Sequence, residues 1–519
     1  MSAPAGETPK MPVLSRLALS LVLACASFGC SDTTPPPAPA ALSFLHAEPD
    51  PLEGGRIVDA LGREVLLRGA NVNSFAEYWS GNDFPTTFPF PESDAERMSE
   101  IGWNAVRLLL SWSRVEPEPG VYDESYIDEI DRVVQRLARH GLYTIIDLHQ
   151  DAWTAVLAAR PDEVCEPPSE PALGWDGAPA WATFDEGRVR CILGGTRETS
   201  PAVVSSWDAF FENAEGPGGV GIRTRYASML GHLSARFANE PAVAGYDIIN
   251  EPGAFSPLQQ EGLSALYSES LASIRAAERA AGGPSHLVLF EPFSLWSVLG
   301  QGPPLDFERD DGVVYAPHIY TGGFSGTPIT RNAFQIAVDE AALFGGAPVL
   351  TGEWGASPSR AGPDGDGYFL DHQGFQDEFH TSATIWTWRE SCGDPHKVSD
   401  ARGGADPPVP WGEFEVDCFT NEIRGERSLL VTDLTRAYVR AAPGRLGRAV
   451  YDPATGGLEV SGTHASSDTE LVVFYPSGKH GEPSVSVEGL VDVETTPGPA
   501  GAVYITGRTS GAEWNLSVE

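Results

Sequence analysis

Positive charge is scarce in this sequence. The 519 residues include 34 Lys and Arg against 72 Asp and Glu, which makes the formal net charge −38 at pH 7. A chain this acidic repels phosphate backbones and anionic lipid headgroups, so nucleic acid is a poor candidate partner. A neutral or weakly polar substrate fits the composition better.

Long apolar runs are also lacking, except near the N-terminus. There a basic residue and the apolar run 17–28 are typical of a secretion signal, and the run is too short to span a membrane. We expect a signal peptide over 1–30 and a Pro/Ala-rich tether over 31–50. The stretch "ASFGCSD" resembles a bacterial lipoprotein signal with Cys30 as the lipidated residue; Cys25 is the weaker alternative, and cleavage without a lipid stays open. The prediction is an exported bacterial protein, either a cell-envelope lipoprotein held at a membrane surface or a secreted protein.

Closely spaced cysteines are absent, which argues against a zinc site. Beyond the N-terminal segment the chain contains four cysteines, which are Cys165, Cys191, Cys392 and Cys418. Each neighbouring pair lies in a Gly- and Pro-rich stretch, and export would bring both pairs into an oxidising compartment. We therefore predict the disulfides Cys165–Cys191 and Cys392–Cys418 and no metal site.

The sequence does contain a regular alternation of apolar strands and amphipathic helices. In the helical pattern 125–141, one apolar face is formed by Ile127, Ile130, Val134 and Leu137. Near-continuous apolar strands separated by such helices indicate a parallel sheet, and eight of them closed on themselves make a (β/α)8 barrel. The predicted strands cover 63–71, 104–112, 143–150, 244–250, 286–292, 313–320, 348–354 and 382–388, and further helices cover 222–238, 257–281 and 332–344.

Two segments depart from this alternation. Residues 155–206 are rich in Pro, Gly and charge and are too long for a plain connection, so we expect an insertion at the rim of the site. After residue 434, short strands with turn signals follow one another without helices. The predicted architecture is a (β/α)8 barrel over 51–434, interrupted at about 155–206, followed by a C-terminal all-β sandwich over 435–519.

Polar or aromatic residues close nearly every predicted strand of the barrel. The chemistry of such a barrel lies at the C-terminal ends of its strands, and packing alone does not predict polar groups there. The candidates in chain order are Asn71, Arg107, His149, Asn250, Glu251, Glu291, His318, Tyr320, Glu353, and Trp386 or Trp388.

Each of these residues alone has an ordinary explanation, such as a solvated loop carboxylate or a satisfied core histidine. The pair Glu291–Pro292 looks much like Glu251–Pro252, so one motif does not identify a site. The combination is more specific, because Asn–Glu closes the fourth strand and Glu353 closes the seventh. Two facing carboxyls can hydrolyse a glycosidic bond, one by protonating the leaving oxygen and the other by taking the sugar carbon.

In this order the motifs resemble glycoside hydrolase family 5, in the clan of retaining (β/α)8-barrel glycosidases. The shared features are an Arg on strand 2, a His on strand 3, "NEP" on strand 4, His and Tyr on strand 6, "GEWG" on strand 7 and a Trp on strand 8. By this resemblance Glu251 is the acid/base and Glu353 is the nucleophile. The resemblance also implies supporting roles: Asn250 binds the sugar 2-hydroxyl, His318 and Tyr320 orient the carboxylates, Arg107 keeps Glu353 ionised, His149 supports the site and Trp386 lies under the glycone.

Within that family, "LRGAN", "DLHQDAW", "GYDIINEP" and "CGDPH" are similar to the endoglycoceramidase branch, whose members cleave the linkage between a glycan and ceramide. The Asp of "HQD", here Asp151, would lie in the glycone site. One departure is Glu77, which stands near the position where characterised members carry a Lys, so the glycone preference stays open. The resemblance implies a retaining β-glycosidase acting on glycosphingolipids or related lipid glycosides.

Other functions remain open at this level. A family 5 β-glycanase would act on polysaccharide in a long open cleft, and a non-catalytic glycan-binding surface protein would not need both carboxylates. No cofactor is predicted, because a carboxyl pair supplies acid, base and nucleophile. Apolar residues after the strand ends would either line a groove for a lipid chain or cap the barrel core; they are Phe255, Phe293, Leu295, Trp296 and Phe324.

Overall fold

An eight-stranded parallel barrel forms the centre of the computed structural model, which describes residues 1–2, 41–402, 404 and 407–519. The strand order is β11-β10-β9-β6-β5-β4-β13-β12, and a parallel bridge between Tyr315 and Val349 connects the two ends of this order. The predicted barrel is therefore confirmed. Its strands are β4 (Arg68–Val72), β5 (Ala105–Ser111), β6 (Tyr143–His149), β9 (Val243–Asp247), β10 (Leu287–Phe290), β11 (Val313–Tyr315), β12 (Leu350–Trp354) and β13 (Ser382–Ile385).

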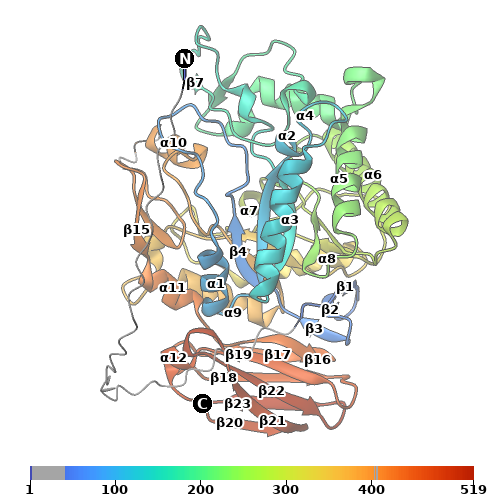
Figure 1. The fold of residues 1–519 in the computed structure, drawn as a ribbon, viewed down its shortest axis with the longest axis vertical. Helices are drawn as coiled ribbons and strands as arrows, with labels where there is room; N and C mark the ends of the chain where they lie inside the picture. The colour runs from blue at the N-terminus through green and yellow to red at the C-terminus, as the bar shows by residue number, and fades with distance from the viewer. Residues whose placement is uncertain (3–40, 403, 405–406) are drawn as a thin grey trace. The chain divides into compact units, whose positions relative to one another are not determined.

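Helices cover the outside of the barrel, as Figure 1 shows for α3, α5 and α6. Helix α3 begins where the Asp123 side chain accepts two backbone N–H groups of the first turn, and the predicted apolar face is buried. Helix α6 spans the predicted range and begins with a capping box between Ser256 and Gln259. The helices are α1 (Glu92–Ile101), α2 (Trp112–Val115), α3 (Glu124–Arg139), α4 (Pro201–Phe211), α5 (Ile222–Phe237), α6 (Pro257–Ala281), α7 (Trp296–Leu299), α8 (Arg331–Leu343), α9 (Tyr368–Glu378), α10 (Pro395–Arg402), α11 (Ser428–Leu434) and α12 (Ser477–His480).

The barrel interior changes from apolar to charged along the strands. Alternate residues of a barrel strand face the interior, so Ile145, Asp147 and His149 on β6 lie at successive levels. Ile145 and Ala105 belong to a buried apolar cluster at the base of the barrel. Arg107, two positions after Ala105, lies one level higher on β5 and is fully buried. The charged level is therefore next to the strand ends where the chemistry is expected.

Two antiparallel sheets form the C-terminal part, as predicted. One has the order β17-β18-β23-β20, and the other has the order β1-β2-β3-β16-β19-β22-β21. Side chains of both sheets share one buried cluster, in which Val473 of one sheet and Leu516 of the other are almost inaccessible. The strands after the barrel are β16 (Tyr438–Pro443), β17 (Arg445–Tyr451), β18 (Leu458–Thr463), β19 (Glu470–Tyr475), β20 (Val485–Glu488), β21 (Leu490–Pro497), β22 (Val503–Thr509) and β23 (Trp514–Val518).

The first predicted strand, 63–71, is in fact two strands that belong to different sheets. Its first half is β3 (Arg63–Val65), which pairs with β16, and only its second half, β4, enters the barrel. Together with β1 (Leu45–Glu48) and β2 (Arg56–Asp59), β3 extends the C-terminal sheet, and Figure 1 shows these strands beside β16. The residues that join them, Leu66 and Leu67, are apolar and give no turn signal, so only the long-range pairing separates the two strands. Residues 45–65, which the sequence analysis divided between tether and barrel, thus lie in the C-terminal sheet.

Buried ions connect the barrel to the segment that enters this sheet. Asp377 on α9 binds Arg436 at 2.5 Å and Arg68 at 3.3 Å, and all three side chains are nearly inaccessible. Residues 3–30 of the predicted signal peptide, which include Cys30, and residues 31–40 of the predicted tether lie outside the described residues. Within the described part of the chain, no helix combines the length and the hydropathy needed to cross a membrane.

Candidate active site

Arg107 is the centre of a buried ion cluster at the carboxyl ends of the barrel strands. Its guanidinium donates to Asp247 at 2.9 Å and to Glu353 at 2.9 Å, and it lies 3.0 Å from both Asp147 and Glu291. Burial opposes the charged form, but these four carboxylates raise the pKa of Arg107 well above its ordinary value. An isolated buried guanidinium would be very costly, so the cluster holds these side chains as one unit.

Glu353 ends β12 with both carboxylate oxygens engaged. Arg107 donates to Oε1 at 2.9 Å, and the Tyr320 hydroxyl donates to Oε2 at 2.9 Å. Burial and the negative charge of Glu353 raise the pKa of Tyr320 well above its ordinary value, so its hydroxyl keeps the proton that it donates. The imidazole Nδ1 of His318 lies 3.5 Å from Oε2. These contacts fix the orientation of the Glu353 carboxylate.

Glu251 follows β9 in a constrained backbone conformation. Its φ is +37°, and its backbone N–H donates to Glu291 Oε2 at 2.8 Å. A positive φ is uncommon for a residue with a side chain and must be held by its surroundings. His318 lies 3.0 Å from Glu251 Oε1 and 3.1 Å from Glu291 Oε1. Glu291, whose Glu–Pro motif looks much like Glu251–Pro252 in the sequence, therefore holds the backbone of Glu251 in position.

The carboxylates of Glu251 and Glu353 face each other closely. One oxygen of each, together with a ring nitrogen of His318, lie within 4.8 Å of one another. Retaining glycosidases place their two carboxyl groups about 5 to 5.5 Å apart, whereas inverting enzymes leave about 6.5 to 9.5 Å for a water molecule. The separation matches the retaining arrangement.

His149, Asp151 and Trp386 lie together on one side of this pair. His149 Nδ1 contacts Asp147 at 2.8 Å, and the His149 ring stacks on Trp386 with centroids 5.6 Å apart. Burial opposes the charge on His149, but Asp147 and Asp151 raise its pKa well above its ordinary value. Trp388, the alternative to Trp386, packs instead against Trp103 in the core.

Asn250 is buried next to Glu251 and is oriented by two partners. Its Nδ2 donates to the backbone carbonyl of Gln150 at 3.1 Å, and its Oδ1 accepts from Arg107 Nη2 at 3.0 Å. All the strand-end residues named from the sequence, apart from Trp388, thus lie around the two carboxylates. Asn71 also belongs to this set, because it accepts from Arg107 Nη1 at 3.0 Å.

The insertion brings a cation to the site that the sequence analysis did not identify. It contains the short strands β7 (Ser169–Pro171) and β8 (Cys191–Leu193), and the predicted disulfide Cys165–Cys191 is present. Six residues after Cys191, Arg197 Nη2 lies 2.5 Å from Asp151 Oδ1 and 3.2 Å from Glu251 Oε2. Nothing in the local sequence distinguishes Arg197 from the other arginines of the insertion.

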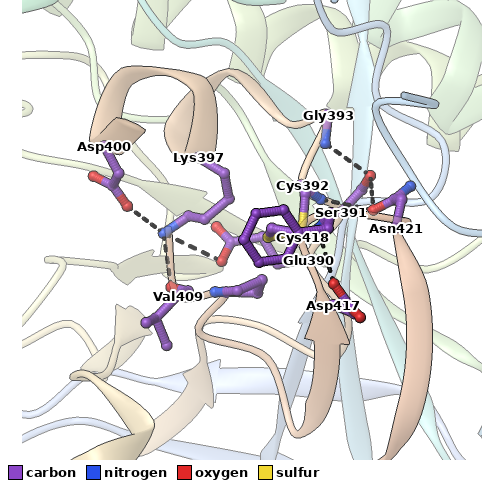
Figure 2. The surroundings of a disulfide bond; sticks show 12 residues. Glu390, Ser391, Cys392, Gly393, Lys397, Asp400, Val409, Asp417, Cys418 and Asn421 are labelled. Atoms are coloured by element: carbon purple, nitrogen blue, oxygen red, sulfur yellow. Dashed lines mark hydrogen bonds and ion pairs between the residues drawn. A yellow bond between two sulfur atoms is a disulfide. The ribbon is translucent and has the colours of Figure 1, made fainter. Parts of the chain in front are cut away.

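The "CGDPH" segment supplies a second cation. The predicted disulfide Cys392–Cys418 anchors this segment to the hairpin of β14 (Phe414–Asp417) and β15 (Glu422–Glu426), and Figure 2 shows the surroundings of this bond. His396 Nε2 lies 3.1 Å from Asp151 Oδ2, and its Nδ1 lies 2.6 Å from Asp394. Burial opposes the charge, but Asp394 and Asp151 raise the pKa of His396 to about 10.

Metal binding is not favoured by the groups that have suitable donor atoms. Among the residues that the structure describes, three sets of His, Asp and Glu lie close enough to share an ion, around Asp151, Glu353 and Glu390. Each of these carboxylates already faces a cationic side chain: Arg197, Arg107 and Lys397, the last of which Figure 2 shows pointing at Glu390. A second positive charge would be repelled from the same oxygens.

The apolar residues after the strand ends divide into two groups. Trp296 is 1% exposed and donates to Glu340, so of the two alternatives left open by the sequence it caps the core. Phe293 is also largely buried. Phe324 is 71% exposed, and its ring lies 4.8 Å from that of Tyr320, which binds Glu353.

The sequence contains further indications of site residues. Asp147 and Asp247 interrupt strongly apolar strands, which is unusual for a buried strand without a polar function. Glu291 also had such a signal, as a strand-end Glu–Pro. Arg197 had none, because it reaches Asp151 only through the folding of a long loop. His396 is the last residue of the "CGDPH" motif, but the motif alone does not show that its side chain reaches Asp151.

A (β/α)8 barrel that carries this carboxylate pair at its strand ends is the framework of a glycoside hydrolase. A family model described as cellulase (glycosyl hydrolase family 5) matches residues 58–391. The chain belongs to glycosyl hydrolase family 5 and is a glycoside hydrolase.

Endoglycoceramidases are among the relatives of this chain. Endoglycoceramidase I of Rhodococcus hoagii (strain 103S) is 25% identical over 468 residues, which cover 86% of this chain and 83% of that protein. Among solved structures, an endogalactoceramidase is 34% identical with a TM-score of 0.80, covering 92% of this chain and 100% of that one. Endo-glycoceramidase II from Rhodococcus sp. in a ganglioside GM3 complex shares the fold, with a TM-score of 0.68 at 23% identity over 89% of this chain and 98% of that one.

Proposed function

We propose that this protein hydrolyses the β-glycosidic bond of glycosphingolipids or related lipid glycosides with retention of configuration. The observation that carries the reaction is the carboxylate pair, whose oxygens lie within 4.8 Å of each other. The endoglycoceramidases and the endogalactoceramidase among the relatives support the lipid glycoside as substrate.

In the first step, the Glu353 carboxylate attacks the anomeric carbon while Glu251 transfers its proton to the leaving oxygen. The glycosidic bond breaks, a glycosyl ester of Glu353 forms, and the lipid alcohol departs. Arg107 and Tyr320 hold the attacking carboxylate in place through their hydrogen bonds. Asn250, fixed by Arg107, is placed to bind the sugar 2-hydroxyl.

In the second step, the Glu251 carboxylate takes a proton from water, and the water oxygen attacks the anomeric carbon. The ester bond to Glu353 breaks, which restores both side chains, and two inversions give net retention. His318 contacts Glu251 at 3.0 Å and stays charged, because the surrounding carboxylates raise its pKa well above the ordinary value despite its burial. His149, Asp151 and Trp386 form the sugar-binding side.

The exposed apolar residues near the carboxylates support a lipid substrate. Phe255, four residues after Glu251, is 38% exposed and lies edge-on to Phe293. Phe324 stacks on Trp411 at 5.3 Å between ring centroids. Apolar side chains that border a polar reaction centre are typical of a site for an amphiphilic ligand.

The substrate class is tested by incubating the purified protein with glucosyl, galactosyl and lactosyl ceramides beside cello- and mannooligosaccharides. We expect cleavage of ceramide glycosides, and proton NMR of the first-formed sugar should show the β anomer. Cleavage of the soluble oligosaccharides alone would instead favour a family 5 β-glycanase, and an initial α anomer would contradict retention.

We also propose that the protein is exported and attached to a membrane surface through Cys30. The two disulfides support an oxidising compartment. Mass spectrometry of the mature N-terminus from bacterial membranes should find a lipid-modified Cys30, and Cys30→Ser should move the protein to the soluble fraction. An unmodified mature protein would contradict the anchor.

A further inference from the structure

Arg197 contacts both the sugar-binding side and the proposed acid/base. Its Nη2 lies 2.5 Å from Asp151 Oδ1 and donates to Glu251 Oε2 at 3.2 Å. Its Nε donates to Glu198 at 2.7 Å, and its guanidinium lies 4.5 Å from the centroid of the Trp175 ring. The side chain is 18% exposed, so it is a built part of the site rather than a mobile surface group.

This contact is incompatible with proton donation by Glu251. A general acid needs a proton on an oxygen that lies within hydrogen-bond reach of the leaving group. In the free protein, Glu251 Oε1 faces the charged His318 and Oε2 accepts from Arg197. Although burial opposes ionisation, His318 and Arg197 together lower the pKa of Glu251. The free site therefore holds the acid/base in its deprotonated form.

The position of Arg197 also makes it displaceable. Asp151, its strongest partner, is the residue that we expect to bind sugar hydroxyls, and His396 already supplies Asp151 with a second cation at 3.1 Å. A sugar hydroxyl bound at Asp151 Oδ1 would compete with the Arg197 guanidinium, which occupies that oxygen, whereas His396 lies against Oδ2 and 3.3 Å from Arg197 Nη1. The glycosidic oxygen of the same sugar needs the Glu251 oxygen that Arg197 occupies.

We propose that Arg197 is a latch that the substrate opens: its guanidinium holds the Glu251 carboxylate in the free enzyme, and sugar binding against Asp151 moves it away so that Glu251 can carry the transferable proton. This inference rests on the proposed function, because it assigns Glu251 as the acid/base. Arg197 is a positioning residue that acts through Glu251.

The latch predicts different pH dependences for the free enzyme and for the substrate complex. The basic limb of the pH profile of kcat/KM reports the pKa of Glu251 in the free enzyme. The basic limb of the kcat profile reports its pKa in the substrate complex. Arg197→Gln removes a cation, so it should move the basic limb of kcat/KM to higher pH by about one unit. The basic limb of kcat should not move, because the latch is already open there. The other charged groups around this pair stay in place in the variant; they are His149, Asp176, Glu198, Glu291, His318, Glu353, Asp394 and His396.

The measurement uses a glycoside with a poor leaving group, for which absence of a pre-steady-state burst shows that proton donation limits kcat. Arg197→Lys keeps a cation and should shift the limb less than Arg197→Gln. Arg190→Gln is the matched control, because Arg190 binds Asp185 and backbone carbonyls of the same insertion without touching the site. If both limbs move equally in Arg197→Gln, or if neither moves, the latch is wrong.

Calorimetry gives a second readout that needs no turnover. A neutral thio-linked disaccharide is titrated into the protein in buffers of different ionisation enthalpy, near the basic limb. The wild type should take up protons on binding, because opening the latch raises the pKa of Glu251, and Arg197→Gln should take up fewer. Equal uptake would overturn the latch. Absence of both binding and hydrolysis in the wild type would instead overturn the proposed function.

Discussion

The two sides of the carboxylate pair are built from opposite kinds of side chain. Towards the insertion, Asp151 makes ion pairs with Arg197 and His396, and its own side chain is only 3% exposed. Towards the loops after β9, β10 and β11, apolar side chains face solvent without ionic partners; they are Phe255, Leu258, Val298 and Phe324, with 38%, 74%, 75% and 71% exposed.

This difference shows how one site can recognise an amphiphile. Charge-assisted hydrogen bonds on the insertion side are directional, so under the proposed function they would read the positions of sugar hydroxyls. Apolar burial on the other side is roughly proportional to area and is indifferent to the detailed shape of a chain. The bond to be cleaved would lie where the two kinds of surface meet.

The largest loss of activity is expected from a change in the carboxylate pair itself. Glu353→Gln removes the attacking carboxylate and leaves Arg107 and Tyr320 without their acceptor charge, so kcat should fall by about 10,000-fold or more for lipid and soluble glycosides alike. Thermal unfolding provides the control that the protein still folds. Activity close to that of the wild type would break the assignment of the nucleophile.

Glu251→Ala should have a large effect that depends on the leaving group. Loss of general acid catalysis is expected to lower turnover of lipid glycosides by about 1,000-fold. An activated aryl glycoside needs no proton, so added azide should restore its turnover and give a β-glycosyl azide. An α-glycosyl azide, or no response to azide, would contradict the acid/base assignment.

Changes on the insertion side should affect every substrate equally. Asp151→Asn removes one charge-assisted contact to the sugar, so kcat/KM should fall by about 10- to 100-fold, whatever the aglycone. Asp185→Asn is the control, because Asp185 binds Arg160 and Arg190 in the same insertion away from the site. A loss confined to lipid substrates would show that the two sides are not separate in function.

Changes on the apolar side should affect only lipid substrates. Phe324→Ser and Leu258→Ser should each lower turnover of a glycolipid in vesicles by about tenfold, because each removes one side chain from apolar contact. Hydrolysis of a soluble aryl glycoside should not change. The control is Leu343→Ser, because Leu343 is similarly exposed but lies at the C-terminal end of α8. An equal loss in this control would show that the apolar residues near the site do not recognise the lipid.

The same contrast explains what the sequence could reveal. Strand-end residues such as Glu251, Glu353 and His318 were predictable, because parallel strands of a barrel bring their carboxyl ends together whatever the loops do. The disulfides were predictable from spacing and context. Arg197 was not, since its approach to Asp151 depends on the tertiary path of a long loop. The "CGDPH" motif marked the segment of His396, but not the contact of its side chain with Asp151.

Strand pairing set a similar limit on the fold. The eight barrel strands followed from their alternation with helices, which is a local pattern. The assignment of β1, β2 and β3 to the C-terminal sheet depends on the contact between β3 and β16, such as Val65 with Ala441. Residues so distant in sequence share no periodicity that would reveal the pairing.

The smallest expected effect is on stability, and it tests the charge state of Asp176 on the insertion side. Asp176 accepts the backbone N–H of Asp151 at 2.9 Å, and burial, against the opposing charge of His149, raises its pKa from 3.8 to about 7. The folded protein therefore keeps a proton that the unfolded chain releases, so stability should fall as pH rises from about 4 to about 7 and then level off. Asp176→Asn keeps the acceptor oxygen without the charge.

The Tm of Asp176→Asn relative to the wild type should accordingly rise by about 2 °C between pH 4 and pH 8. Asp185→Asn should show no such rise from pH 5 to pH 8, because its hydrogen bond and ion pair with Arg190 outweigh burial and lower the pKa of Asp185, which is then ionised in both states. Scanning calorimetry at matched ionic strength makes the comparison. A flat difference for Asp176→Asn would mean that its carboxyl is ionised throughout, and that the insertion side carries one more negative charge than its geometry indicates.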